Sequence, residues 1–398
     1  MTAVAQLEAA RVKQRRIALT GNHAVALAAK MAKVEVIAAY PITPQTPAVE
    51  RLAEFVNNGE LDAEYIPVEG EHSALSAVLG ASAAGARVFT ATSSQGLGFM
   101  YEILPIAVGL RLPIVMGIAT RAYSAPINVW GDYSDVMSMR ELGWIIYMVS
   151  NVQEAFDTTI QAYRVGEDSS VHLPVVVAYD GFWISHVLQP LDVPEDEEAV
   201  IKYAPITRTW KKLDVDNPAS LGAVGTPEWY FEIRYAAYKA LEESIKVVEQ
   251  ADIEYGKMFG RSYGFGSTYR LEDADVAIVT YGSIYGLAKM AADALRQQGI
   301  RAGAMKLRLL RPWPTDFIKR SLEGVEKVFV VDRAFNHGGL VGPVATEVAA
   351  TLARPVYNAY ATIGMRATDS RAIAAAAERV AKGEVQPMRP FNIGLRGP

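Results

Sequence analysis

Glu71 is the residue whose type and position most strongly suggest chemistry. It begins a predicted helix that runs to Ala86 and consists mostly of Ala, Gly, Ser and Leu. Because such small side chains let a helix pack closely on its neighbours, we expect Glu71 to lie at an apolar interface. Burial raises the pKa of a carboxyl group, which would let Glu71 share a proton with a ring nitrogen of a cofactor. The alternative is an ordinary first-turn acid that complements the helix dipole.

Thr43 and Arg121 are candidates for binding a substrate. Thr43 lies in the segment YPITPQT, where two prolines fix a turn after a predicted strand. Arg121 follows a strand predicted at 112–119, and a guanidinium group can hold a carboxylate through two parallel hydrogen bonds. Ligands of open α/β sheets bind beyond the carboxyl ends of the strands. The alternatives are a helix-opening turn at Thr43 and a local ion pair at Arg121.

Three further segments carry weaker signals. Gln95 and Gly96 lie in TSSQGLG, where small residues would let a cofactor approach backbone N–H groups at a helix start. This segment matches no phosphate-binding motif, and a plain strand-to-helix turn also explains it. The glycines of GGLVG at 338–342 fit either a nucleotide loop or close helix–strand packing. Asp132 and Asp135 are either metal ligands or caps of a helix predicted at 136–142.

The elements that must position these residues form an alternating pattern over residues 17–189. Apolar extended runs alternate with helical segments, which indicates a parallel sheet covered by helices on both faces. The predicted strands are 34–40, 63–68, 87–92, 112–119 and 173–179, and the predicted helices are 22–33, with Asn22 as its cap, 46–57, 71–86, 94–108 and 153–166.

The rest of the chain predicts a second domain. Residues 1–189 form the first α/β domain, and 190–265 hold an acidic, proline-containing linker followed by a long amphipathic helix at 229–259. A second alternating block then indicates a smaller, separate α/β domain at 266–398.

Composition excludes several classes of protein. The sequence has 398 residues and no Cys, so disulfides, thiolate catalysis and Cys-ligated zinc or iron–sulfur clusters are excluded within it. Five dispersed His show no ligand spacing, and we expect no metal site. A net charge of −5 with scattered Lys and Arg predicts no nucleic-acid partner. No apolar run approaches a membrane span of roughly 20 residues and no signal peptide is seen, so we expect a cytoplasmic protein without a membrane contact.

One carboxylate, one hydroxyl and one Arg without a nucleophile–base pair suggest a borrowed cofactor. The chain resembles the alpha subunit of archaeal-type 2-oxoacid:ferredoxin oxidoreductases, most closely the pyruvate enzymes. The resemblance covers almost the whole chain. It rests on YPITP at 40–44, GELDAEYIPVEGEHSALSAVLGASAAGARVFTATSSQGL at 59–97, LRLPIVMGIATRAYSAPINVWGDYSD at 110–135, YRVGEDSSVHLPVVVAYDGFWISH at 163–186 and RPWP at 311–314.

The resemblance implies a fold and a reaction. The expected fold is a parallel-sheet, pyrimidine-type domain of thiamine-diphosphate enzymes plus a smaller α/β domain like the transketolase C-terminal domain. The expected reaction is oxidative decarboxylation of pyruvate with CoA to acetyl-CoA, CO₂ and reduced ferredoxin. Thiamine diphosphate would be shared with a beta subunit that holds Mg²⁺ and a [4Fe–4S] cluster, and gamma and delta partners, separate or fused, would add a CoA-related domain and further clusters.

The resemblance also implies roles for single residues. Glu71 falls on the glutamate that contacts the aminopyrimidine N1′, with Gln95 and Gly96 beside the cofactor. Thr43 and Arg121 fall on positions that contact the substrate carboxylate. Residues 124–135 match the active-site loop.

One departure leaves the substrate preference open: Gly131-Asp132-Tyr133 stands where relatives often have Asn-Asp-Trp. Branched-chain or broad 2-oxoacid specificity therefore remains an alternative to pyruvate. In other classes, a non-catalytic assembly subunit remains possible, whereas a nucleotide-binding dehydrogenase is disfavoured because GxGxxG is absent.

Overall fold

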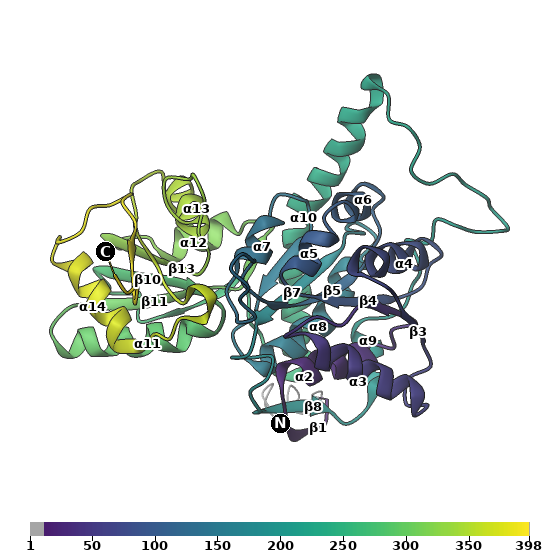
Figure 1. Cartoon of the computed structure of the whole chain (residues 1–398), viewed down its shortest axis with the longest axis horizontal. Coiled ribbons are helices and arrows are strands. Elements are labelled where there is room, and N and C mark those ends of the chain that lie inside the picture. The colour runs from purple at the N-terminus through teal and green to yellow at the C-terminus, as the bar shows by residue number, and fades with distance from the viewer. Residues whose placement is uncertain (1–11, 398) are drawn as a thin grey trace, which may run out of the picture.

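The computed structural model describes residues 12–397. Two large sheets, one of seven strands and one of six, stand side by side, each flanked by helices (Figure 1). Within residues 12–397, no helix is both long and apolar enough to cross a membrane.

The seven-stranded sheet carries the predicted site residues at its strand ends. Its strands lie in the order β12-β6-β7-β5-β4-β2-β3, and all neighbours are parallel except β12, which runs antiparallel to β6. Its strands are β2 (Val36–Ala39), β3 (Glu64–Pro67), β4 (Val88–Thr92), β5 (Val115–Thr120), β6 (Ile145–Met148), β7 (Val175–Asp180) and β12 (Leu309–Arg311).

Helices cover both faces of this sheet, as the unbroken apolar strands require. Figure 1 shows α2 (Gly21–Met31), α3 (Thr46–Asn57) and α8 (Val152–Gly166) on one face. The opposite face carries α4 (Glu71–Ala83), α5 (Gln95–Phe99) and α6 (Ile103–Gly109), while the short α7 (Ser134–Ser138) follows the loop after β5. The arrangement confirms the predicted α/β class with a parallel sheet.

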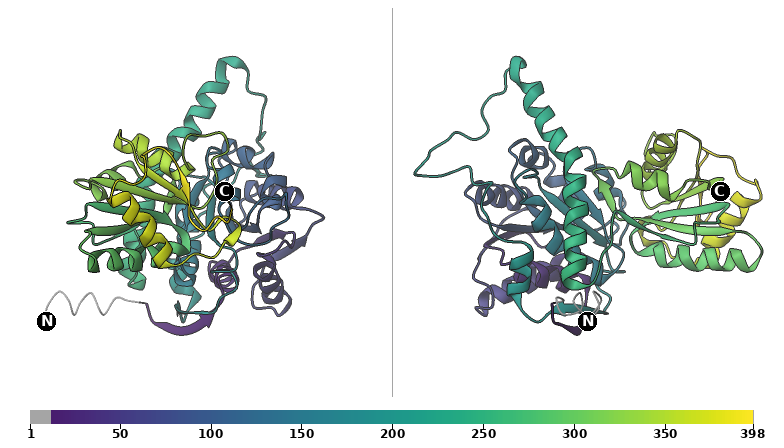
Figure 2. Two further views of the ribbon diagram at one scale, coloured as in Figure 1. Left: turned by 60° about the vertical axis from the view of Figure 1, so that its left-hand side comes forward. Right: turned by 180° about the vertical axis from the view of Figure 1, so that it is seen from behind.

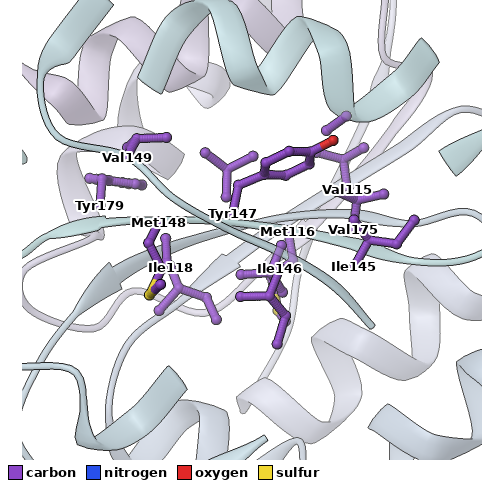
Figure 3. Packing of buried hydrophobic residues seen from close by; sticks show 14 of the residues in the cluster. Val115, Met116, Ile118, Ile145, Ile146, Tyr147, Met148, Val149, Val175 and Tyr179 are labelled. Carbon is purple, nitrogen blue, oxygen red and sulfur yellow. The ribbon is translucent and has the colours of Figure 1, made fainter. Parts of the chain in front are cut away.

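The core of this part lies between β5, β6, β7 and the covering helices. Figure 3 shows its close packing. The residues labelled there are each at most 3% exposed: Val115, Met116, Ile118, Ile145, Ile146, Tyr147, Met148, Val149, Val175 and Tyr179. Burying one such side chain contributes on the order of 1.5–3 kcal/mol, so the strand ends stand on a rigid base.

Some local predictions differ from the structure. The cap of α2 is Thr20, whose hydroxyl accepts a hydrogen bond from the N–H of His23 (3.3 Å), and not Asn22. The segment predicted as a linker forms β8 (Gln189–Pro194), paired with β1 (Gln14–Leu19), and α9 (Glu197–Tyr203). The two strands form a separate two-stranded ribbon, in which Leu191 and Val193 of β8 are buried.

The six-stranded sheet has the order β15-β14-β13-β10-β11-β9, with only β9 antiparallel to its neighbour. Helices α11 and α14 pack together, as do α12 and α13. The bounds are β9 (Gly266–Tyr269), β10 (Val276–Tyr281), η1 (Gly282–Ile284), α11 (Tyr285–Gln297), β11 (Ala302–Leu307), α12 (Thr315–Ser321), β13 (Lys327–Asp332), α13 (Pro343–Leu352), β14 (Tyr357–Tyr360), η2 (Ile363–Met365), α14 (Ser370–Ala381) and β15 (Phe391–Asn392).

The long helix α10 (Pro227–Phe259) runs behind the first sheet, and its first turns project beyond the rest of the chain (Figure 2). Its buried side chains begin at Ala237 and continue to Phe259, and it packs on α8 and α6. The divisions at residues 189 and 265 stay predictions, and β12 shows that the later part of the chain also pairs with the first sheet.

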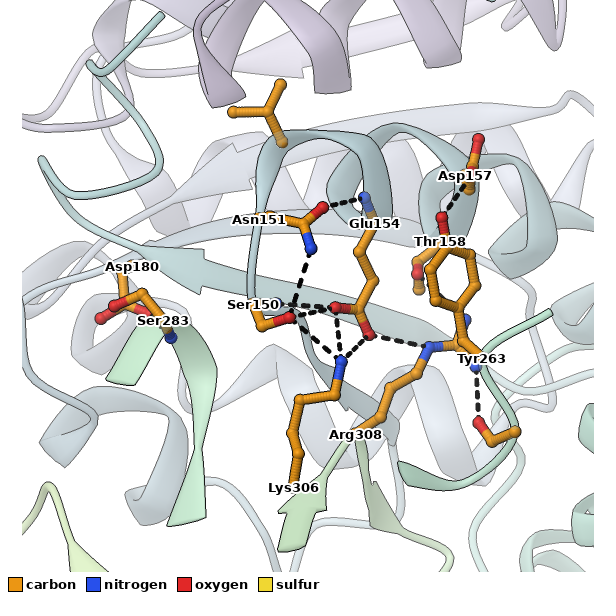
Figure 4. Close-up of polar contacts among 12 residues, drawn as sticks. Ser150, Asn151, Glu154, Asp157, Thr158, Asp180, Tyr263, Ser283, Lys306 and Arg308 are labelled. Carbon is orange, nitrogen blue, oxygen red and sulfur yellow. Dashed lines mark hydrogen bonds and ion pairs between the residues drawn. The ribbon is translucent and has the colours of Figure 1, made fainter. Parts of the chain in front are cut away.

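A buried ionic cluster joins the two large sheets (Figure 4). Nζ of Lys306 on β11 donates to both carboxylate oxygens of Glu154 on α8, at 2.9 and 2.7 Å. Nε of Arg308 lies 3.4 Å from the same carboxylate. The attraction between opposite charges offsets the free-energy cost of burying them only when the charges are closely paired in this way. The cluster therefore fixes the six-stranded part against α8.

Candidate active site

Glu71 begins α4, after Gly70 in an extended conformation. Only 6% of its surface is exposed. Burial raises the pKa of the Glu71 carboxyl group, against a smaller opposing contribution from its own backbone N–H. The structure therefore buries the Glu71 side chain, while its position at an apolar interface stays a prediction.

Gly96 in the first turn of α5 lies against this carboxyl group. A Cβ atom at Gly96 would lie 2.5 Å from Oε1 of Glu71 and 2.5 Å from Oγ1 of Thr92. The Thr92 hydroxyl is buried and has no hydrogen-bond partner among the described residues. A carboxyl group and a hydroxyl without a partner thus converge on a point where the backbone carries no side chain.

The turn that carries Thr43 is held by two amide side chains. Nε2 of Gln45 donates to the carbonyl oxygens of Tyr40 (3.1 Å) and Ala91 (2.8 Å). Nδ2 of Asn22 donates to the carbonyl oxygen of Pro44 (2.8 Å). Asn22 therefore fixes the loop beside Thr43 rather than capping its own helix, and Thr43 itself stays exposed at the surface of the site.

Arg121 at the end of β5 reaches the same turn. Its side chain is held at two points: Nη1 donates to the carbonyl oxygen of Thr43 (2.9 Å), and Nε donates to that of Asn128 (3.0 Å). Arg121 is 7% exposed, and burial lowers its pKa while Asp135 raises it. An arginine side chain stays charged at any physiological pH. Both hydrogen-bond acceptors of the side chain are neutral, and among residues 12–397 the guanidinium group forms no salt bridge with a carboxylate, so Asp135 acts on it only from a distance.

Asp135 connects the two strand ends. Its Oδ2 accepts hydrogen bonds from the backbone N–H groups of Ser94 (3.0 Å) and Arg121 (2.9 Å), and Oδ1 accepts one from Val136 (2.8 Å). Burial raises the pKa of Asp135 to about 7, although the backbone N–H groups oppose that shift. Ser94 has a φ of +47°, a conformation that costs free energy for a residue with a side chain. Asp135 therefore holds the start of α5 in place.

The structure brings the predicted residues together at the carboxyl ends of β2, β3, β4 and β5. Glu71 touches Gly96, Arg121 holds Thr43, and Asp135 links the two groups. The Gln95 side chain lies beside them and accepts a hydrogen bond from Oγ of Ser94 (2.7 Å). Sequence reasoning missed Asn22, Gln45 and Asn128, because an amide bound to distant backbone leaves no local pattern.

The other segments singled out in the sequence have structural roles. Asp132 accepts hydrogen bonds from the N–H (2.9 Å) and hydroxyl (2.6 Å) of Ser134 at the start of α7. At the end of GGLVG, a Cβ on Gly342 would lie 2.1 Å from Oδ2 of Asp332, so close packing explains this glycine. Within residues 12–397, no three His, Cys, Asp or Glu gather as a metal site would require.

Comparison with known proteins points in one direction. The chain matches the family described as pyruvate flavodoxin/ferredoxin oxidoreductase, thiamine diphosphate-binding, over residues 27–252. Residues 274–373 match pyruvate:ferredoxin oxidoreductase core domain II.

Individual relatives are similar over most of their length. Pyruvate synthase subunit PorA of Methanothermobacter thermautotrophicus is 46% identical over 87% of this chain and 91% of its own. The same subunit of Pyrococcus abyssi is 42% identical over 96% of this chain and 98% of its own. Ketoisovalerate oxidoreductase subunit VorA of Pyrococcus horikoshii is 42% identical over 92% of this chain and 93% of its own.

Two solved structures share the fold. The 2-oxoglutarate:ferredoxin oxidoreductase from Magnetococcus marinus, solved with 2-oxoglutarate, coenzyme A and succinyl-CoA bound, has a TM-score of 0.69 at 23% identity. The likeness covers 92% of this chain and 65% of the Magnetococcus chain. A split-gene transketolase in an inactive beta4 tetramer has a TM-score of 0.54 at 14% identity, covering 92% of this chain and 98% of its own. Both likenesses confirm the predicted fold class.

Proposed function

The chain belongs to the pyruvate flavodoxin/ferredoxin oxidoreductase family, and from this premise we propose that Glu71, Thr43 and Arg121 form its share of the active site. It is an alpha subunit of a 2-oxoacid:ferredoxin oxidoreductase that acts on pyruvate. In our proposal, Glu71, Gln95 and Gly96 face the pyrimidine of thiamine diphosphate, and Thr43 and Arg121 face the substrate carboxylate.

The residues around Glu71 fit an aminopyrimidine. Such a ring presents a nitrogen that can accept or share a proton and an amino group that can donate a hydrogen bond. A buried carboxyl group with a raised pKa suits the ring nitrogen. The unpartnered hydroxyl of Thr92 converges with Glu71 on Gly96, and a buried polar atom without a partner calls for an explanation. The contact of Glu71 with Gly96 is the observation that carries the proposal.

The residues of this chain then have defined tasks. When bound, thiamine diphosphate supplies the nucleophilic carbon and accepts the electron pair released on decarboxylation. Glu71 holds or shares a proton at the pyrimidine N1′ atom. Arg121 attracts the carboxylate of the 2-oxo acid, and Thr43 fixes it from the neighbouring turn, which is catalysis by positioning. Glu71 and Arg121 are largely shielded from bulk water, whereas Thr43 is open to solvent.

Partner chains supply the remaining chemistry in this proposal. A beta subunit provides the diphosphate and Mg²⁺ side of the cofactor site and a [4Fe–4S] cluster. Gamma and delta subunits, separate or fused, provide a CoA-related domain and the clusters that pass electrons to ferredoxin. The absence of Cys from this sequence supports this division, because iron–sulfur clusters require thiolate ligands from elsewhere.

The test replaces Glu71 with Gln in the complete, co-purified complex. We expect pyruvate-dependent ferredoxin reduction to be almost lost while the subunits stay assembled, because the amide cannot take or give the proton. Unchanged turnover would contradict the role of Glu71 and would favour a non-catalytic assembly subunit. A panel of 2-oxo acids run with the wild-type complex tests the branched-chain alternative, which the similarity to VorA keeps relevant.

A further inference from the structure

Asn128 lies in the loop after β5, and both polar side-chain atoms and the backbone carbonyl oxygen of this residue form hydrogen bonds. Its backbone carbonyl accepts the hydrogen bond from Nε of Arg121 (3.0 Å). Its Oδ1 accepts one from the N–H of Trp130 (2.7 Å), and its Nδ2 donates to the carbonyl oxygen of Gly364 (3.3 Å). Gly364 lies in η2, after β14 of the six-stranded sheet. Asn128 therefore links Arg121 to the far part of the chain.

Gly364 also forms a second hydrogen bond to the loop after β5. Its N–H donates to Oδ2 of Asp132 (3.0 Å), whose other oxygen holds Ser134 at the start of α7. Gly364 has a φ of +56°, and a Cβ at this position would lie 2.4 Å from Nδ2 of Asn128. Only glycine fits the conformation and the contact together. The backbone carbonyl and N–H of Gly364 thus hold the loop at two residues, Asn128 and Asp132.

We propose that Asn128, clamped by Gly364, is a positioning residue that sets the plane of the Arg121 guanidinium group for the substrate carboxylate. The inference rests on the proposed function of Arg121. The group is planar, and two bonds, to Thr43 and Asn128, fix that plane. Among the described residues, no hydrogen bond is made by Nη2, which stays available to a carboxylate. Paired hydrogen bonds to a carboxylate depend strongly on such alignment.

The six-stranded part therefore takes part in substrate recognition without touching the substrate. The competing explanation is that Asn128 only stabilises the loop. A stabilising contact would lower the unfolding temperature and kcat when removed, but it would leave the KM for the 2-oxo acid unchanged. A positioning contact would raise that KM selectively, which gives the experiment its readout.

The first variant is Asn128→Ala in the complete complex, which removes the side-chain bonds but keeps the carbonyl that holds Arg121. We expect the KM for pyruvate to rise about tenfold, as for the loss of alignment at a charged hydrogen bond, with kcat changed less than about threefold. The KM for CoA should stay unchanged. Faster hydrogen exchange of the peptide covering residues 122–135 should accompany the higher KM.

The second variant is Gly364→Ala, which should raise the KM for pyruvate because the new Cβ displaces the Asn128 amide. Its matched control is Gly383→Ala, since Gly383 also has a positive φ (+71°) but no atom lies within 4 Å of its Cβ position. Gly383→Ala should leave the KM unchanged. In the double variant Asn128→Ala/Gly364→Ala, the KM should equal that of Asn128→Ala alone, because the clash needs the amide.

An unchanged KM for pyruvate in Asn128→Ala, whether or not stability falls, would overturn the inference while leaving the proposed function intact. The inference would also be overturned if the increase in the KM for pyruvate in the double variant were the product of the increases in the two single variants. If the wild-type complex failed to reduce ferredoxin with pyruvate, or if Glu71→Gln were fully active, the proposed function itself would fall. The two failures are thus separable.

Discussion

The backbone of Gly96 forms a wall of the site that holds the carboxyl group of Glu71, with only 2.5 Å between Oε1 and the place where a Cβ would be. Glu71 begins the helix after β3, and Gly96 lies in the helix after β4. In the sheet these two strands lie on either side of β2. Two helix starts therefore meet across one intervening strand, and the contact depends on the absence of a side chain at Gly96.

Gly96→Ala should lower kcat for pyruvate oxidation by about one to two orders of magnitude, because the new methyl group pushes the Glu71 carboxyl group away and a small misplacement of a catalytic group can cost about 100-fold. Steady-state kinetics of the complete complex measures this effect. Gly80→Ala in α4 is the control, since no atom lies within 4 Å of a Cβ there, and it should keep full activity. Equal rates in both variants would contradict the prediction.

Arg121→Lys should raise the KM for pyruvate by about 10- to 100-fold, equivalent to about 1.5–3 kcal/mol for hydrogen bonds to a charged group. Lysine keeps the charge but lacks the planar fork that spans Thr43 and Asn128. The control is Arg111→Lys, because Arg111 also binds a backbone carbonyl, that of Val171 (3.1 Å), but away from the site. A KM that rises equally in both variants would show a general structural effect.

The buried Asp135 should make the stability of the chain depend on pH. Its pKa is about 7 in the folded state, against about 3.9 for an ordinary Asp. The folded state therefore binds this proton more tightly than the unfolded state. Protonation of Asp135 thus contributes to the free energy of unfolding. This contribution is fully present below pH about 4 and decreases as the pH rises to about 7, by about 1.4 kcal/mol per pH unit at most.

Asp135→Asn tests this dependence. The variant should be less stable than the wild type at pH 5, because one amide N–H₂ would face backbone N–H donors, at a cost of about 1–3 kcal/mol. The difference between the two proteins should shrink as the pH approaches 7, where the wild type begins to bury a charge. Thermal unfolding at a series of pH values measures the difference. A gap that stays constant from pH 4 to 7 would contradict the raised pKa.

The sequence allowed the main features of the sheet and the site to be predicted, for physical reasons. Unbroken apolar runs such as β5 and β7 occur where both sheet faces are buried, and residues after such strands must meet at one edge. Thr43 and Arg121 were located in this way. The small residues around Glu71 indicated its close packing.

What escaped prediction depends on contacts between distant segments. The sequence predicts a strand at 302–308 but gives no sign of β12 directly after it. The N–H groups of Arg308 and Leu309 both bond to the carbonyl of Phe265, and the chain then leaves β11 to form β12 in the other sheet. The roles of Asn22 and Asn128 likewise depend on partners far along the chain. Local periodicity carries no information on such partners.

The last prediction concerns the ionic cluster between the sheets. Lys306→Met should destabilise the chain by about 3–5 kcal/mol, because removing one partner of a buried ion pair leaves the other charge uncompensated. Lys306 is 4% exposed, and its Nζ also donates to Oγ of Ser150 (3.0 Å). The nearby Arg308 offsets part of the loss, since it lies 3.4 Å from Glu154. Denaturant unfolding measures the change in free energy.

Two further variants separate the burial effect from the loss of charge. Lys382→Met removes an exposed pair with Glu378 (2.6 Å), and an exposed pair contributes little to stability because water screens it. Lys306→Met combined with Glu154→Gln should be less destabilised than Lys306→Met alone, because no carboxylate then remains buried without its partner. Burial opposes the charged form of Glu154, while Lys306 and Arg308 hold its pKa below the usual value. A similar small loss in Lys306→Met and Lys382→Met would show that the cluster does not fasten the two sheets.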